Sequence, residues 1–192
     1  PQLHALIKSK KITSLELTKL YIKRLKQHNS SLFCVINLTE DLALKQAKRA
    51  DSLLKNGIIL GPLHGIPYGL KDLISVEGYP TTCGAYQYKN QRINKTATIA
   101  RELERSGAVL VAKLVSGSLA RGDVWFGGMT RNPWDPKQGA SGSSAGSGSA
   151  TAAGLVGFSI GTETLGSIVS PSTRNGITGL RPSYGRVSRN GV

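Results

Sequence analysis

Two serines and one lysine in this sequence have the residue types and surroundings that nucleophilic catalysis needs. Ser143 and Ser167 each lie in a glycine-rich turn, and Lys71 follows the short segment Ile66–Leu70. Glycines let a carbonyl group approach a serine oxygen while backbone N–H groups face the developing oxyanion. A serine also needs a nearby base, and an uncharged lysine can take that role. The set predicts a nucleophile, a proton relay and a base for amide-bond hydrolysis.

The elements around these residues are expected to bring them together. Ala108–Ala112 is apolar at every position, which is typical of a strand inside a sheet that helices cover. The segment between Ser143 and Ser167 is long enough for a turn, a helix and a returning strand, Leu155–Ile160, so the two serines can lie side by side. Lys71 is expected at the end of a neighbouring strand, where α/β folds collect catalytic groups.

The segment Gly139–Gly154 consists almost wholly of glycine, serine, alanine and threonine. Flexible linkers have a similar composition. This segment, however, leads directly into Leu155–Ile160, which is predicted to be a buried strand. We therefore expect a helix here, with small side chains that let it pack closely on its neighbours.

Amphipathic helices precede the candidate site. Thr13–Glu16 has the pattern of a capping box and begins a helix with apolar residues at helical spacing. Leu32–Ile36 is predicted to be a buried strand, and Thr39 is expected to cap a second helix that ends at Gly57. A further helix is predicted over residues 97–106.

The predicted organisation is one α/β unit that is part of a larger domain. We divide it into an N-terminal helical region, residues 1–58, and a core, residues 59–192, that carries the candidate site. The chain opens on Pro1 and stops just after a turn-like segment, so both ends are expected to be cut and a C-terminal part of the fold to be missing.

Composition leaves several functional classes open and argues against others. The net charge of +14 could attract nucleic acid or an anionic surface, but few aromatic residues alternate with the basic ones, so stacking platforms are not apparent. Cys34 and Cys83 are expected to be free thiols, and the scattered histidines predict no metal site. No apolar run has membrane-spanning length. The compartment stays open, with the cytoplasm favoured, because a signal peptide would lie upstream of Pro1.

The motifs from about Leu60 onward resemble those of the amidase signature enzymes. Five blocks carry the resemblance: Gly65–Pro67 with Lys71–Asp72, Asn132–Pro136, Gly142–Ser147, Gly161–Ile168 and Gly179–Ser188. The resemblance implies an α/β amidase-signature fold, with a mixed central β-sheet flanked by helices. It also implies hydrolysis of a carboxylic amide through a serine acyl-enzyme, with no metal or cofactor.

The same resemblance assigns a Ser–cis-Ser–Lys triad to this chain. It implies that Lys71 is the base, that Ser143, after a cis peptide, relays the proton, and that Ser167 is the nucleophile. Backbone N–H groups of Thr164, Leu165, Gly166 and Ser167 are expected to hold the oxyanion. Ser144 is expected to hydrogen-bond within the lysine network or to cap a helix.

The chain departs from the commoner family pattern at three positions. Leu165 and Ala145 stand where many members have glycine, and Glu163 replaces a frequent aspartate. Leucine disfavours positive φ, so either position 165 has ordinary backbone angles or the oxyanion site is reshaped. An inactive family member is therefore one alternative.

Other interpretations concern the partners. The A subunit of a glutamine-dependent aspartyl/glutamyl-tRNA amidotransferase shares this triad, but such proteins usually carry Asn-Met-Asp-Glu-Phe where this chain has Val115–Leu119. Amidotransferase partner subunits and a homodimer therefore stay open beside a small-molecule amide substrate. A basic nucleic-acid-binding module is the alternative from another class.

Ser144 also fits the nucleophile elbow of α/β-hydrolases, and Ser52–Lys55 fits a penicillin-binding pattern, but neither has its companion residues in this sequence.

Overall fold

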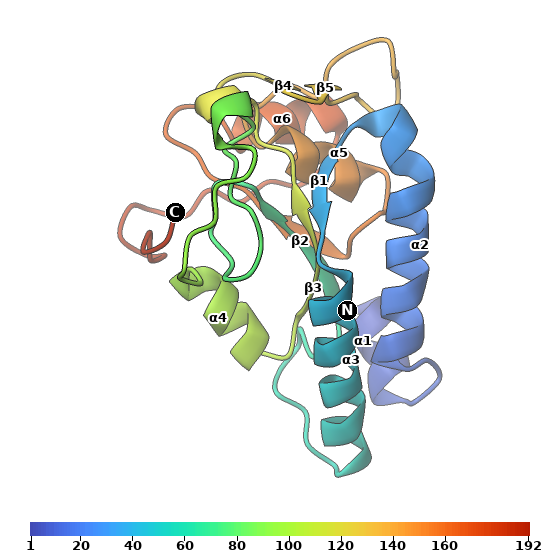
Figure 1. Ribbon diagram of the computed structural model, residues 1–192. Coiled ribbons are helices and arrows are strands. Elements are labelled where there is room, and N and C mark those ends of the chain that lie inside the picture. The colour runs from blue at the N-terminus through green and yellow to red at the C-terminus, as the bar shows by residue number, and fades with distance from the viewer.

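A four-stranded mixed β-sheet runs through the centre of the computed structural model, which describes residues 1–192 (Figure 1). The strands are β1 (Val35–Leu38), β2 (Pro67–Lys71), β3 (Val109–Leu114) and β6 (Phe158–Ile160). Their spatial order is β1-β3-β2-β6, with β1 antiparallel to β3 and with β2 parallel to both β3 and β6. The predicted α/β class and the mixed central sheet are confirmed.

Strand β3 is buried at every position because helices pack against both faces of the sheet. Val109 and Val111 belong to a core cluster with α2 (Ser14–Leu32), α3 (Glu40–Lys55) and α5 (Ala145–Ala152). Leu110 belongs to a second cluster with α4 (Thr98–Arg105). The remaining elements lie at the edges of this core: α1 (Gln2–Lys8), α6 (Val169–Asn175), the hairpin β4 (Val124–Trp125) and β5 (Gly128–Met129), and the 3₁₀ turns η1 (Tyr86–Tyr88) and η2 (Ser118–Ala120).

The predicted capping box at the start of α2 is confirmed. Thr13 Oγ1 accepts a hydrogen bond from Glu16 N, and Thr13 N donates to the Glu16 carboxylate. Asp51 on α3 accepts from the N–H groups of Ser14 and Leu15, at 2.7 and 3.0 Å. A carboxylate at a helix N-terminus satisfies free donors, so this contact fixes α3 against the start of α2.

Two predictions near the N-terminus, the start of β1 and the cap by the Thr39 side chain, are wrong. Helix α2 continues to Leu32 and ends at Phe33 in the left-handed conformation (φ 51), so β1 begins only at Val35. Thr39 occupies the predicted N-cap position of α3, but its side chain makes no capping bond, because its hydroxyl donates to Leu110 O on β3 at 2.7 Å. The predicted stop of α3 at Gly57 is confirmed: the helix ends at Lys55, and Gly57 just beyond it is left-handed (φ 77), with its N–H donating to Leu54 O.

The glycine-rich segment forms the predicted helix α5, and it packs closely on the sheet. A Cβ atom at Gly146 would lie 2.3 Å from both Cys34 O and Val115 N, so only glycine fits there without a shift of the backbone. The strand that follows is shorter than predicted. Leu155 and Val156 are buried in a turn after the helix, and β6 begins at Phe158.

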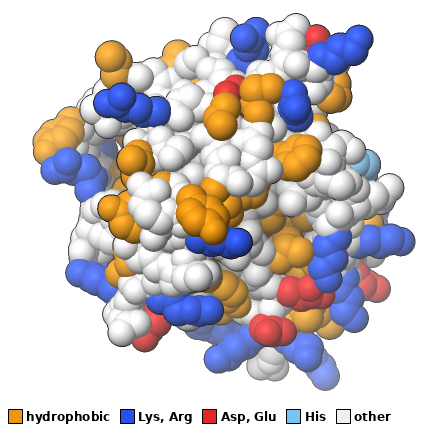
Figure 2. Space-filling view, turned by 45° about the horizontal axis from the view of Figure 1, so that its top comes forward, with side chains coloured by type: hydrophobic (Ala, Val, Ile, Leu, Met, Phe, Trp, Pro, Cys, Tyr) orange, Lys and Arg blue, Asp and Glu red, His pale blue; other side chains and the backbone are white.

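The surface is rich in basic residues. Figure 2 shows lysine and arginine side chains spread over the visible face, with exposed hydrophobic side chains between them. Large apolar residues are exposed along the whole chain, and the most exposed of them, Leu165, Leu180 and Tyr184, lie late in it. Cys34 and Cys83 are free thiols, as expected. No helix combines the length and apolar composition needed to cross a bilayer.

Candidate active site

Lys71 lies at the end of β2, with its side chain fully buried. Its Nζ atom is 2.8 Å from Ser143 Oγ and 2.9 Å from Thr162 Oγ1. The parallel neighbours β3 and β6 hold β2 on both sides, so the position of the amine is set by the sheet rather than by a loop. The predicted place of Lys71 at a strand end is confirmed.

Ser143 and Ser167 come together from two different turns. Ser143 follows a cis peptide bond after Gly142 and is 1% exposed. Its Oγ lies 3.1 Å from Ser167 Oγ, and Ser144 N donates to Ser167 O, which ties the two turns together. Lys71, Ser143 and Ser167 thus form one continuous chain of hydrogen-bonding groups, and Ser167 is the member nearer to solvent.

The electrostatic surroundings of Lys71 favour its uncharged form. Burial lowers the pKa of Lys71 from 10.5 to about 7. No carboxylate forms an ion pair with it, and its hydrogen-bonding partners are hydroxyl and carbonyl oxygens from Ser143 and Thr162. A lysine in this environment can lose its proton near neutral pH and then accept one from a serine.

A second buried lysine, Lys113, has the opposite environment. Its Nζ lies 2.7 Å from the carboxylate of Asp72, and both side chains are 0% exposed. Burial lowers the pKa of Lys113 as well, but the Asp72 carboxylate opposes that effect. Asp72 follows Lys71 directly in the sequence, yet its carboxylate pairs with Lys113 and not with Lys71.

The turn before Ser167 holds the remaining predicted binding residues. Leu165 has ordinary backbone angles and is 92% exposed, and the left-handed conformation occurs at Gly166 (φ 81). The N–H groups of Thr164, Leu165 and Ser167 donate no hydrogen bond within the chain, so they are free to bind an oxyanion. Of the two alternatives for position 165, the structure has the one with ordinary backbone angles.

Glu163 fixes the end of this turn. Its side chain is only 6% exposed, and its carboxylate accepts from Ile168 N at 2.7 Å and from Val169 N at 2.9 Å, on either side of the start of α6. Arg181 lies 3.4 Å from the other carboxylate oxygen. The longer side chain at position 163 therefore reaches the backbone just beyond Ser167.

Ser144 joins the network through Thr162 rather than by capping α5. Its Oγ donates to Thr162 O at 3.1 Å and accepts from Thr162 N at 3.2 Å, and it makes no helix-cap bond. Sequence reasoning missed two residues of the site, Thr162 and Lys113. Thr162 lies in the same motif block as Ser167, Gly161–Ile168, so its position in the sequence could have indicated a place in the site. Nothing in the sequence near Lys113 indicated that it lies there.

No group of three or more histidine, cysteine, aspartate or glutamate side chains in residues 1–192 is placed to hold a metal ion. His64 is buried, and its Nε2 lies 3.0 Å from Ala50 O between α3 and the loop before β2. The Ser52–Lys55 pattern falls on the last turns of α3, away from the glycine-rich turns.

Comparison with known proteins identifies the class of this fold and site. The family described as Amidase matches residues 16–192, and the chain belongs to that family. The A subunit of glutamyl-tRNA(Gln) amidotransferase from Chloroflexus aurantiacus is 42% identical over 94% of this chain. The match spans 38% of that relative, so the chain covers about two fifths of its length.

Solved structures agree with this assignment. The peptide amidase from Stenotrophomonas maltophilia superimposes with a TM-score of 0.92 at 38% identity, over 99% of this chain and 41% of the other. A fatty acid amide hydrolase superimposes with a TM-score of 0.91 at 29% identity, over 99% of this chain and 34% of the other. The amidase-signature fold and the predicted family are confirmed.

Proposed function

We propose that this chain carries the catalytic groups of an amidase, which hydrolyses a carboxylic amide through an acyl-enzyme on Ser167. The observation that supports this most directly is the hydrogen-bonded chain Lys71–Ser143–Ser167, with distances of 2.8 and 3.1 Å. Amidase-family membership supports the same reaction class. Each of the three residues has one role that follows from its position in the chain of contacts.

The reaction begins at the buried end of the relay. Uncharged Lys71 accepts the proton of Ser143 while Ser143 accepts that of Ser167, whose oxygen attacks the amide carbon. The tetrahedral oxyanion binds the free N–H groups of the Thr164–Ser167 turn, and each such donor typically lowers the barrier by roughly 3 kcal/mol. Ser143 then donates a proton to the departing amine, and water hydrolyses the acyl-enzyme.

A serine-directed fluorophosphonate tests this mechanism in the complete gene product that carries residues 1–192. We expect a covalent adduct on Ser167 that Ser167→Ala abolishes, and we expect Lys71→Ala to abolish amide turnover while circular dichroism stays native. Ser52→Ala and Lys55→Ala on the exposed end of α3 are matched controls that keep labelling and turnover. Turnover near the wild-type rate in Ser167→Ala or Lys71→Ala would refute the assignment. Absence of an adduct in folded wild-type protein would identify an inactive family member.

A second candidate is the A subunit of a glutamine-dependent tRNA amidotransferase. The identity of 42% to such a protein favours it. The Val115–Leu119 segment argues against it, since those proteins usually carry Asn-Met-Asp-Glu-Phe there. The two candidates differ in one assay: the amidotransferase component releases ammonia from glutamine only or mainly with its partner subunits present, whereas a free-standing amidase turns over amides alone.

A further inference from the structure

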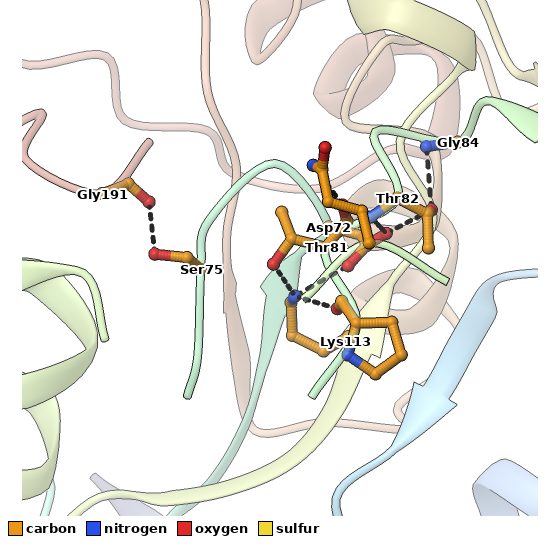
Figure 3. Close-up of polar contacts among 9 residues, drawn as sticks. Asp72, Ser75, Thr81, Thr82, Gly84, Lys113 and Gly191 are labelled. Atoms are coloured by element: carbon orange, nitrogen blue, oxygen red, sulfur yellow. Dashed lines mark hydrogen bonds and ion pairs between the residues drawn. The ribbon is translucent and has the colours of Figure 1, made fainter. Parts of the chain in front are cut away.

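The ion pair between Asp72 and Lys113 lies inside the protein at the level of the proposed base. Asp72 follows Lys71 at the end of β2, and Lys113 stands beside Leu114, the register partner of Lys71 on β3. Figure 3 shows the two side chains pointing toward each other beneath the loop that carries Thr81 and Thr82. Because neither charge reaches solvent, each depends on the other for neutralisation.

The remaining polar contacts of the pair are with residues of the 80–82 segment. Asp72 Oδ2 accepts from Thr82 N at 2.9 Å and from Thr82 Oγ1, and Lys113 Nζ donates to Pro80 O at 3.0 Å. Lys113 also lies 3.3 Å from Thr81 Oγ1. Thus no other charged side chain is available to neutralise either group if its partner is removed.

Few other titratable groups face Lys71. The 80–84 loop contributes the Cys83 thiol, whose pKa is raised chiefly by burial, so it is neutral near pH 7. The segment after β6 contributes Thr162, and the carboxylate of the next residue, Glu163, is held by Ile168 N, Val169 N and Arg181. The turn of Ser143 contributes hydroxyl groups only. Asp72 and Lys113 form the only ion pair in which both side chains are fully buried, and Asp72 directly follows Lys71 in the chain.

We propose that Lys113 is a positioning residue of the reaction: its ammonium neutralises Asp72 and so keeps the neighbouring Lys71 in its uncharged, proton-accepting form. This inference rests on the proposed function of Lys71. An unpaired Asp72 carboxylate in a dry interior would attract a proton onto Lys71. The base would then be blocked at the pH where the wild-type protein is active.

The pair also holds the 80–84 loop, so a purely structural role has to be separated from the electrostatic one. Cys83 O accepts from Leu119 N, and Gly117 N donates to Ser143 O, which connects this loop to the relay. Loosening the loop would lower turnover at every pH. It would not move the pH at which Lys71 gains its proton, and it would not respond in opposite directions to removal of the two charges.

The titration of Lys71 is measured by NMR in protein labelled with ¹³Cε-lysine, with Lys71→Met to assign the signal. In Lys113→Met we expect the pKa of Lys71 to rise by about one unit, which lowers kcat/KM at pH 6 about tenfold. In Asp72→Asn we expect the pKa of Lys71 to fall. In the double variant, with both substitutions, we expect it to return close to the wild-type value. Lys26→Met, which removes an exposed cation paired with Glu40, is the matched control and leaves the titration unchanged.

An unchanged Lys71 titration in all three variants would overturn the proposal, whether or not the protein turns over amides. If Lys113→Met fails to fold, Asp72→Asn is compared with the double variant, and equal Lys71 pKa values in those two would overturn it as well. A wild-type protein that lacks amidase activity but shows the expected shifts would contradict the proposed function and leave the electrostatic coupling supported.

Discussion

Replacing Lys71 by methionine tests whether burial of its amine, which keeps the proposed base uncharged, lowers the free energy of unfolding. Methionine is close to lysine in length but carries no ammonium group. The pKa of Lys71 falls from 10.5 in an exposed lysine to about 7 in the fold, because burial disfavours the charged form. The unfolded chain therefore binds more protons than the folded one between about pH 7 and pH 10.5, so the stability of the wild-type protein rises with pH across that range.

The size of the effect follows from that difference. Below pH 7 the buried amine opposes folding by about 5 kcal/mol, and at pH 9 by about 2 kcal/mol. Methionine removes this cost but loses the contacts with Ser143 and Thr162, at about 1 kcal/mol each. We expect Lys71→Met to be about 3 kcal/mol more stable than wild type at pH 6 and nearly equal to it at pH 9, with no turnover at either pH.

Urea unfolding at several pH values, followed by circular dichroism, measures this difference. Other titrating groups affect both proteins alike, so the comparison isolates Lys71. A variant less stable than wild type at pH 6, or a stability difference that does not change with pH, would show that Lys71 is charged in the folded protein. The proton relay through Ser143 would then lack its acceptor.

Two further predictions concern the packing of α5 and the support of Lys71. In Gly146→Ala the new Cβ meets backbone atoms at 2.3 Å, so we expect a loss of stability on the order of 3 kcal/mol in urea unfolding, whereas Ser52→Ala on the surface of α3 should change it little. Thr162→Val removes the hydroxyl 2.9 Å from Lys71 Nζ, and we expect kcat/KM to fall about tenfold with a native unfolding midpoint. Thr173→Val, at an exposed position, is the control and keeps full activity. An unaffected rate in Thr162→Val would show that Thr162 does not orient the base.

The relay groups could be located from the sequence because their surroundings are chemically distinctive. Glycine-rich turns around Ser143 and Ser167 mark places where backbone and substrate approach closely, and the apolar run of β3 identifies the sheet that such turns border. The helix α5 followed from small residues leading into an apolar segment. In each case, local composition and tertiary role agree.

The features that sequence reasoning missed depend on contacts between distant segments. Lys113 is the only charged residue of an otherwise apolar strand and would ordinarily be expected to reach solvent, since nothing local indicates that Asp72 turns toward it. Phe33 takes a left-handed conformation that glycine usually provides, so the end of α2 carried no glycine signal. Thr39 binds a strand carbonyl 71 positions away instead of its own helix.

The dryness around Lys71 has a consequence for when the protein can react. An amine that loses its proton only because water is excluded regains the proton as soon as water enters. In the proposed mechanism, any opening motion wide enough to hydrate the end of β2 would protonate Lys71 and so leave Ser167 without a base, and closure would reverse this. Under the proposed mechanism, Ser167 would therefore be reactive only while the end of β2 is shut off from water.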